Sequence, residues 1–539
     1  MGPSPTGWTY GELWETVADT LPDAPCLAQG DRRLTWQEVD RRADGVATAL
    51  VGAGLGHQDK VAQYLYNCPE YLESVFACFK AALVPVNTNY RYVDDELVHL
   101  WDNGDVAAVV FHGSFTASCE RVRDRVPGVR LWLWVDDGTG PCPTWAEPYE
   151  AAATSPPPER YRPAWGRSPD DLYLVYTGGT TGLPKGVMWR QEDLFLVGNR
   201  TAKVRYPVDA DDRLVASMLT EPGPVHVPVP PLMHATGSIT SFAVWGSGGS
   251  VVLLPGRSFD AGELFDTIDA ERAASVVIVG DVHGKPMLEA LDAAPGRWDL
   301  STVRVLSSTG AMWSAPVKER LSAHLPRAIL VDTLGSSEAP GIASSVTRAG
   351  EPASTARFSV TDDTRVLTED GRWVEPGSGE RGLLARRGAT SLGYYKDAEK
   401  TATTVRTVDG QRWMVPGDWA TVEADGTISL LGRGSGTINT GGEKVFPEEV
   451  EEALKTDPAV RDVVVVGVPD DRFGETVCAV VELEPGASAT LEQLRAACRD
   501  RIAAYKAPRR LLVVGSLERQ ANGKVDRASW QARAAAGTS

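Results

Sequence analysis

The sequence predicts an α/β protein with a large N-terminal domain of mostly parallel sheets and a small, mobile α+β domain at its C-terminal end. Its 539 residues are several times the length of a typical domain. Between residues 250 and 331, short β-branched runs alternate with helical patterns, which is typical of βαβ units. A glycine-rich joint at residues 432–436 then precedes a compact final segment.

The first predicted helix begins after Thr35. Thr35 and Glu38 have the spacing of a capping box, and apolar residues then recur at helical intervals up to Leu50. Gly52 and Gly54 are expected to end this helix. Residues 138–168 are rich in Pro and Gly and predict a long surface excursion.

The middle of the chain predicts a buried parallel sheet, followed by a region with a different pattern of strands. A separate strand is expected at 172–176, and the strands of the predicted sheet at 250–254, 276–280, 302–306 and 328–331. From about 357 to 431, short alternating strands with glycine turns predict a small antiparallel or barrel-like subdomain.

The final segment predicts a domain of about 100 residues. Pro447 followed by two glutamates is a favourable helix start, because proline fits the first turn and acids face the positive end of the helix dipole. Residues 463–468 and 477–483 are expected to be strands. We therefore divide the chain into a domain over 1–432, a hinge at 433–436 and a lid domain over 437–539.

Composition excludes several classes of function. A net charge of −18 argues against sequence-independent binding of nucleic acid, which needs a dense cationic face. Seven cysteines without a CxxC pair, and no apolar secretory segment at the start, predict a reduced, cytoplasmic protein. Since no apolar run reaches about 18 residues, no membrane span is expected. The oligomeric state stays open, and a homodimer is compatible with the sequence.

The segment from Tyr176 to Gly186 carries the strongest chemical signal. Glycines after a strand let backbone N–H groups approach an anion, hydroxyls can donate to phosphate oxygens or contact a metal, and a lysine supplies charge. A Walker A loop is excluded, because Pro184 precedes the lysine and Gly186 follows it. The residues of this predicted phosphate loop are Thr177, Gly178, Gly179, Thr180, Thr181, Gly182 and Lys185.

This loop resembles the phosphate-loop signature of the adenylate-forming superfamily, which comprises acyl-CoA synthetases, adenylation domains and luciferases. The other signatures of that family occur in the same order between about residues 35 and 527. The resemblance implies that His234, in Pro230–His234, borders an acyl pocket, and that Gly310 and Ala311 line the adenine and acyl sites.

The resemblance also implies a nucleotide site. In the stretch Asp332, Thr333, Leu334, Gly335, Ser336, Ser337 and Glu338, the glutamate would hold magnesium together with Thr177, and Leu334 replaces the aromatic that usually stacks on adenine. Asp418 and Arg433 correspond to the ribose contacts, and Ser435 to the hinge residue. Gly441 and Gly442 correspond to the lining of a pantetheine tunnel, and Lys524 to the lysine that reaches the acid and the α-phosphate.

The function that the resemblance implies is activation of an organic acid by ATP and Mg²⁺ as an acyl-AMP, followed by transfer to coenzyme A. Lys524, His234 and Lys185 are the expected catalytic residues. The segments 86–92, 176–190 and 431–451 are most similar to actinobacterial steroid and fatty-acyl-CoA synthetases. Alternatives on the same scaffold are adenylation of nitrite for diazotisation of an aryl amine, and loading of a carrier protein. Binding of nucleotide without turnover is a further alternative.

Overall fold

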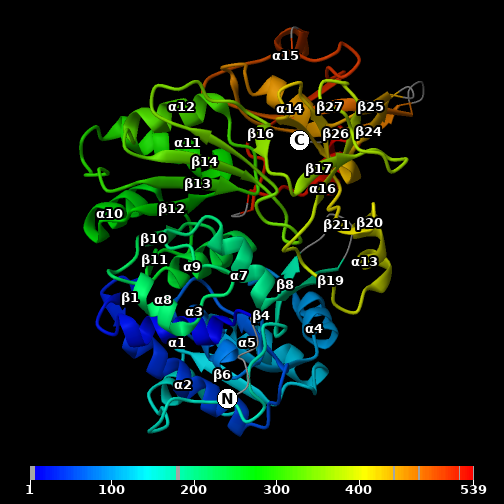
Figure 1. Cartoon of the computed structure of the whole chain (residues 1–539). Helices are drawn as coiled ribbons and strands as arrows, with labels where there is room; N and C mark the ends of the chain where they lie inside the picture. The colour runs from blue at the N-terminus through cyan, green and yellow to red at the C-terminus, as the bar shows by residue number, and fades with distance from the viewer. Residues whose placement is uncertain are drawn as a thin grey trace.

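The computed structural model describes residues 7–177, 183–440, 443–470, 474–499, 501–520 and 523–537. These residues confirm the predicted fold class, with helices packed on two sheets that each have a parallel part, and a small α+β lobe at the C-terminal end. Figure 1 shows that lobe, in orange and red, beside the green segment that carries α11 and α12, with the blue N-terminal helices at the other end of the molecule.

One sheet of the described residues has eight strands. Its six strands from β8 to β7 are parallel, and β9 and β19 add an antiparallel edge. In spatial order the strands are β19 (Gly393–Tyr394), β9 (Lys185–Arg190), β8 (Leu172–Thr177), β4 (Val84–Asn87), β3 (Lys60–Tyr64), β5 (Val106–His112), β6 (Leu131–Val135) and β7 (Glu147–Pro148).

The second sheet has a parallel part that contains the predicted βαβ strands. It begins with the antiparallel edge strand β2 and runs in parallel from β1 to β14. The strands in order are β2 (Arg32–Thr35), β1 (Pro25–Gln29), β11 (Ser250–Leu253), β10 (Val225–Pro228), β12 (Ser275–Ile278), β13 (Val305–Thr309) and β14 (Ile329–Leu334).

The expected barrel-like subdomain is an open antiparallel extension of this second sheet. Within the described residues 343–433 the strands do not close into a barrel, because each continues the sheet edge outward from β14. The strands are β15 (Ala343–Thr347), β16 (Arg357–Val360), β23 (Ile428–Arg433), β22 (Asp418–Val422), β18 (Arg381–Arg386), β21 (Gln411–Met414) and β20 (Val405–Val408), with β17 (Thr364–Leu367) paired to β18.

Helices form three layers around the two sheets. The largest apolar cluster joins α1, α2, α3 and α9 to residues of both sheets, so these helices lie between them. A second cluster packs α10, α11 and α12 on the second sheet, and a third packs α4 and α5 on the first. The helices that precede residue 434 are α1 (Tyr10–Thr20), α2 (Trp36–Gly52), α3 (Pro69–Lys80), α4 (Asp94–Asn103), η1 (Gly113–Phe115), α5 (Thr116–Val122), η2 (Arg123–Arg125), α6 (Tyr149–Ala153), α7 (Gln191–Asn199), α8 (Asp212–Met218), α9 (Ala235–Gly246), α10 (Ala261–Glu271), α11 (Gly280–Ala293), α12 (Ala315–His324) and α13 (Ala398–Thr404).

Residues 438–537 form what we call the C-terminal lobe, and residues 7–433 the large lobe. The C-terminal lobe has its own sheet and its own apolar clusters, and the short helix η3 (Gly434–Gly436) precedes it. Its elements are β24 (Ile438–Thr440), β25 (Glu443–Val445), α14 (Pro447–Leu454), β26 (Val460–Asp470), β27 (Gly474–Leu483), α15 (Leu491–Arg499), β28 (Arg510–Val514) and α16 (Arg527–Ala536).

Several local predictions are confirmed. Thr35 caps α2 by accepting from the Glu38 amide at 3.2 Å, while Glu38 accepts from the Thr35 amide at 2.8 Å. Helix α14 begins at Pro447, as expected. Among the residues that the structure describes, a search for membrane-spanning helices finds none with the length and apolarity required.

Candidate active site

The predicted acyl and nucleotide segments follow the parallel strands of the second sheet. The register pairs Pro228 with Val277, Ile278 with Ser308, and Thr309 with Thr333, so β10, β12, β13 and β14 end at one edge. In open α/β sheets, ligands bind in the crevice beyond the carboxyl ends of the strands. The segments that leave this edge contain His234, Gly280, Gly310–Ala311 and Gly335–Glu338.

Asn87 joins this edge to the strand that leads into the phosphate loop. Its amide nitrogen donates to the carbonyl oxygens of Tyr176 at 2.9 Å and Met233 at 2.6 Å, and its side-chain oxygen accepts from the Tyr176 amide at 2.6 Å. Asn87 is buried at the end of β4. One side chain therefore fixes both the strand residue before Thr177 and the residue before His234.

The phosphate loop connects two antiparallel strands. Gly178, Gly179, Thr180, Thr181 and Gly182 lie outside the described residues. Thr177 ends β8 and pairs directly with Lys185, the first residue of β9. Because a strand follows the loop, where a Walker A loop has a helix, the chain differs from that motif in structure as well as in sequence. The Lys185 Nζ lies 2.6 Å from an oxygen of Asp397.

His234 is held neutral beside the strand edge. It occupies the N-cap position of α9, and its carbonyl accepts from the amides of Gly237 at 3.0 Å and Ser238 at 3.2 Å. Burial, together with the charges of Lys524 and Arg91, lowers the pKa of the His234 imidazole to about 3. At neutral pH the ring therefore carries no charge.

The C-terminal lobe approaches His234 and Ala311 through the turn that carries Lys524. A Cβ at Gly523 would lie 2.9 Å from the Cβ of Ala311 and 2.8 Å from Val279, so only glycine fits there without a shift. Gly523 has a φ of +74° and Gly310 a φ of +94°, which are left-handed conformations that glycine tolerates. Lys524 itself is exposed, and its charge reaches His234.

Glu338 is oriented by residues of the first sheet. The Tyr394 hydroxyl donates to Glu338 Oε1 at 2.5 Å, and the Trp189 indole donates to the Ser337 carbonyl at 2.8 Å. The described residues contain no group of three or more His, Cys, Asp or Glu side chains that could hold a metal ion. A single carboxylate fits magnesium bound mainly through phosphate oxygens better than it fits an all-protein cage.

The rest of the 332–338 stretch is engaged within the protein. Asp332 is buried and its carboxylate lies 2.8 Å from the Lys318 Nζ. Burial raises the pKa of Asp332, and Lys318 opposes that shift. Leu334 packs against the apolar cluster of the antiparallel extension. The Ser336 carbonyl accepts from the Ala339 amide at 3.2 Å, and a Cβ at Gly335 would lie 2.8 Å from the Gly341 amide.

The predicted ribose contacts are cross-strand neighbours in the register of two strands next to the predicted hinge. Asp418 on β22 is the register partner of Arg433 on β23, and Asp418 is buried. The pKa of the neighbouring Glu448 is raised to about 7, mainly by burial and also by the charges of Glu451 and Asp418, although the charge of Arg527 opposes the shift. The side chains of Arg433 and Ser435, and all of Gly441 and Gly442, lie outside what the structure describes.

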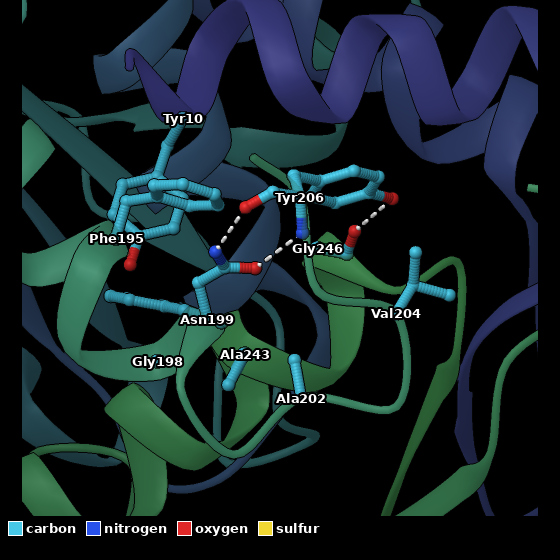
Figure 2. Close-up of a pocket in the computed structure, with 10 residues that line it drawn as sticks. Tyr10, Phe195, Gly198, Asn199, Ala202, Val204, Tyr206, Ala243 and Gly246 are labelled. Carbon is cyan, nitrogen blue, oxygen red and sulfur yellow. Dashed lines mark hydrogen bonds between the residues drawn. The ribbon is translucent and has the colours of Figure 1, made fainter. Parts of the chain in front are cut away.

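A small pocket lies at the end of α9 opposite to His234 (Figure 2). Asn199 and Tyr206 close one side, where the Asn199 amide donates to the Tyr206 carbonyl at 2.8 Å and the Tyr206 hydroxyl donates to the Gly246 carbonyl at 2.8 Å. The other lining residues are aromatic or small, namely Tyr10, Phe195, Gly198, Ala202, Val204, Phe242 and Ala243.

Sequence reasoning missed the residues that position these groups. Asn87 and Tyr394 act through contacts between the two sheets, and Lys318 pairs with Asp332 across the packing of α12 on β14. Asn87 gave a usable signal, because it is a polar residue directly after the apolar residues of β4 and ends that buried strand. Tyr394 and Lys318 gave none, since their partners depend on the tertiary arrangement.

Comparison with known proteins identifies related chains over nearly the whole length. A family model described as AMP-binding enzyme matches residues 14–395, and one described as AMP-binding enzyme C-terminal domain matches residues 449–524. The chain is 41% identical over 525 residues to a medium/long-chain-fatty-acid–CoA/3-oxocholest-4-en-26-oate–CoA ligase of Mycobacterium marinum, covering 96% of this chain and 94% of the relative.

Two further similarities agree with that match. A 3-oxocholest-4-en-26-oate–CoA ligase of Rhodococcus rhodochrous is 40% identical over 528 residues, covering 96% of this chain and 94% of the relative. A crystal structure of the anthranilate CoA ligase AuaEII in complex with anthranoyl-AMP has a TM-score of 0.83 at 22% identity, covering 99% of this chain and 98% of that one. At that identity the structural likeness concerns the fold alone.

Proposed function

The chain belongs to the AMP-binding enzyme family, and from that premise we propose that it is an AMP-forming acid–thiol ligase. It activates an organic acid with ATP as an acyl-adenylate and transfers the acyl group to coenzyme A, releasing pyrophosphate and AMP. The observation that carries this proposal is the match of 96% of the chain, including both lobes, to relatives named as CoA ligases.

The chemistry explains why two substrates are needed before the thiol can react. A carboxylate is a poor electrophile, since its charge is delocalised and its leaving group would be oxide. Attack of the carboxylate oxygen on the α-phosphorus of ATP forms a mixed anhydride, expels pyrophosphate and gives the acyl carbon a good leaving group. The thiol of coenzyme A then attacks that carbon and displaces AMP.

In this proposal Lys524 offsets the charge that grows on the α-phosphate. Its support is the position of the Gly523–Lys524 turn against Ala311 and the effect of the Lys524 charge on His234. A neutral His234 can border the acid without attracting its carboxylate away from the phosphorus. Preorganised charge of this kind is usually the largest contribution to catalysis.

The nucleotide contacts are proposed from the family pattern. Lys185 and the loop 177–182 would bind the β- and γ-phosphates, and Asp418 and Arg433 the ribose hydroxyls. Gly310, Ala311 and the stretch 332–337 would form the adenine side of the site, with Asp332 acting through its ion pair with Lys318. Thr177 and Glu338 would hold a magnesium ion, which when bound offsets negative charge on the phosphates.

We further propose that the two steps use two arrangements of one hinge. Rotation at residues 433–436 would withdraw Lys524 and bring Gly441 and Gly442 beside the pantetheine arm of coenzyme A. Residues 1–432 and 437–539 would then move as separate bodies. The glycine on each side of Ser435 and the separate apolar clusters of the C-terminal lobe support this division.

The proposed acid is a medium- or long-chain fatty acid or a steroid carboxylate. The relatives at 40–41% identity are named for these acids, which favours them over nitrite and over a carrier-protein acceptor. All seven cysteines are free thiols and six are buried, which supports a reducing compartment such as the cytoplasm.

The decisive experiment measures pyrophosphate release with ATP and magnesium across fatty, steroid and aryl carboxylates and nitrite, each with and without coenzyme A or an aryl amine. We expect release with fatty or steroid acids and a thioester product when coenzyme A is present. Release only with nitrite, accelerated by the amine, would overturn the proposal in favour of a diazo-forming enzyme.

A further inference from the structure

The C-terminal lobe docks on the large lobe through a charged face of α11. Asp281 and Lys285 lie one helical turn apart on that helix. The Lys285 ammonium donates to the Arg461 carbonyl, and Arg461 lies 3.3 Å from Glu289 further along the helix. The same lobe carries Lys524, so contacts at this face bear on where that lysine sits.

Asp281 uses one carboxylate oxygen to hold the loop beside Ala311. The Asp281 Oδ1 accepts from the amide of Ser314 at 2.9 Å and from its hydroxyl at 3.1 Å. The Asp281 amide donates to the Met312 carbonyl at 3.0 Å. These bonds fix residues 312–314, which follow directly on the predicted acyl and adenine residues.

The other oxygen of Asp281 faces the C-terminal lobe. It lies 3.8 Å from the Nζ of Lys455, and within the described residues it has no hydrogen-bond partner. The side chains of Asp281 and Lys455 are 7% and 9% exposed. Lys455 Nζ also lies 3.2 Å from Oδ1 of Asp462, so this buried ammonium stands between one carboxylate from each lobe.

Asp462 continues the contacts to the turn that carries Lys524. Arg519 donates to both oxygens of Asp462, at 2.5 and 3.1 Å, and to the Gly523 carbonyl at 2.9 Å. Burial opposes ionisation of Asp462, but Lys455 and Arg519 outweigh it and hold the Asp462 pKa below its usual range. The peptide group that Arg519 holds is the one that leads into Lys524.

We propose that Asp281, Lys455, Asp462 and Arg519 are positioning residues that lock Lys524 into the site during adenylation and are uncoupled during thioester formation. The inference rests on the proposed ligase function. Asp281 belongs to the large lobe and the other three residues to the C-terminal lobe. Rotation at the hinge must therefore break the Asp281–Lys455 contact, whereas the contacts of Asp462 with Lys455 and Arg519 stay intact.

The physical basis is the pairing of charges across the joint. Without the Lys455 ammonium, the buried Asp281 carboxylate would lose the charge that offsets its own next to the partly exposed Asp462 carboxylate, which favours separation of the lobes. A displacement of about 1 Å at a reacting group can cost about 100-fold in rate. Loss of Lys455 is therefore expected to weaken adenylation without changing a residue that contacts the substrates.

A double-mutant cycle with Asp281→Asn and Lys455→Met tests the inference. Asparagine keeps the acceptor for Ser314 while it removes the charge that faces Lys455. Each variant should lower kcat for pyrophosphate release about 10- to 100-fold, and their effects should be non-additive by about threefold or more. Thioester formation from supplied acyl-AMP should stay within about twofold of the unaltered enzyme.

The control is Glu289→Gln, which alters an exposed pair at the rim of the same face and should change adenylation by less than about threefold. Equal losses in both half-reactions for Lys455→Met, or additive effects in the cycle, would overturn the inference. If the unaltered enzyme releases no pyrophosphate with any acid, the proposed function fails instead.

A crosslinking measurement tests the contact without any activity. Cysteines at Glu289 and Arg461, in a Cys142→Ser background, should be joined by a short bismaleimide in the docked arrangement. Adding Lys455→Met should lower the yield of crosslinked protein about threefold or more. Adding Lys203→Ala, which removes an exposed ion pair far from this face in sequence, should leave that yield unchanged. An unchanged yield with Lys455→Met would overturn the proposed lock.

Discussion

The two halves of the candidate site are held together in opposite ways. On the large lobe, Asn87 ties the strand before the phosphate loop to the segment before His234 through buried, uncharged hydrogen bonds. On the face of α11, the C-terminal lobe is held by charged side chains, including Asp281 and Lys455. Buried neutral bonds between sheets give a fixed framework, whereas polar interfaces between domains allow motion.

The difference teaches which parts of the site must stay and which must move. His234, Gly310 and Glu338 belong to strands or loops of the large lobe, so in the proposed mechanism both half-reactions would use them in one geometry. Lys524 belongs to the C-terminal lobe, so its charge acts on His234 only while that lobe is docked. Variants of the large lobe should therefore affect both half-reactions, whereas variants that disturb Lys524 or its docking should affect mainly adenylation.

The largest effect is expected for Lys524→Ala, which removes the mobile charge itself. Pyrophosphate release should fall about 100- to 1000-fold, the usual cost of losing one stabilising donor. Thioester formation from supplied acyl-AMP should be nearly unchanged, because that step would follow withdrawal of the lysine. Lys203→Ala, at an exposed surface pair, is the matched control. An equal loss in both steps would erase the distinction between the two halves.

Asn87→Ala tests the fixed half. It leaves the buried amide and carbonyl of Tyr176 and the carbonyl of Met233 without their partner, at about 1–3 kcal/mol for each unsatisfied group. We expect both half-reactions to fall together, about 10- to 100-fold, with a lower midpoint of urea unfolding. Asn87→Asp keeps one acceptor and should recover only the bond from the Tyr176 amide. Loss of adenylation alone would contradict the assignment of Asn87 to the framework.

Ser435→Pro tests the hinge between the halves. Proline fixes φ near −65° and removes an amide donor, so it should resist the rotation that thioester formation needs. We expect thioester formation to fall about tenfold more than adenylation. Ser435→Ala, which keeps the amide donor and leaves φ free, is the control. Equal losses in both half-reactions would refute the hinge at 433–436.

The same division explains what could be predicted from sequence. Helices and strands depend on local signals, so the Thr35 capping box, the βαβ run and the Pro447 helix start were all predicted correctly. The barrel-like alternative was wrong because closure depends on which strands pair, and β16 pairs with β23 from far along the chain. Local patterning does not specify such a partner.

Site residues divide in the same way. The phosphate loop, His234 and Lys524 stand out because their residue types and spacing match a known family over most of the chain. Asn87, Tyr394 and Lys318 do not, since each acts on a partner that only the packed sheets bring near. The Asp281–Lys455 contact is even harder to predict from the sequence, because it forms only when the two lobes dock on each other.

Ala243→Leu tests the pocket of Figure 2, which belongs to the fixed half. Ala243 already lies against Gly198, where a Cβ would be 3.2 Å from the Ala243 Cβ, so a larger side chain fills the hollow. If the far end of a long acid occupies this pocket, kcat/KM for long-chain acids should fall about tenfold relative to short ones. Val208→Leu, at an exposed position outside the pocket, is the control. A uniform loss across chain lengths would separate the pocket from acid selection.

The smallest expected effect is on the pH dependence of stability. As the pH falls, protonation of buried histidines in the large lobe should lower the free energy of unfolding before the charged contacts between the lobes are affected. Burial lowers the pKa of His226 to about 4 from an ordinary 6.5, and its ring nitrogens contact Ser275 and Thr240 at 3.0 and 3.2 Å. Below about pH 6.5 the unfolded chain binds a proton that the folded chain excludes, so stability is full above that pH and declines toward pH 4. At pH 5.5 the loss of unfolding free energy from this group should be about 1 kcal/mol.

The His226→Asn variant should lose correspondingly less free energy of unfolding than the unaltered protein between pH 7 and pH 5.5, as measured by urea unfolding. An equal loss in both proteins would show that His226 is not part of the acid-sensitive framework.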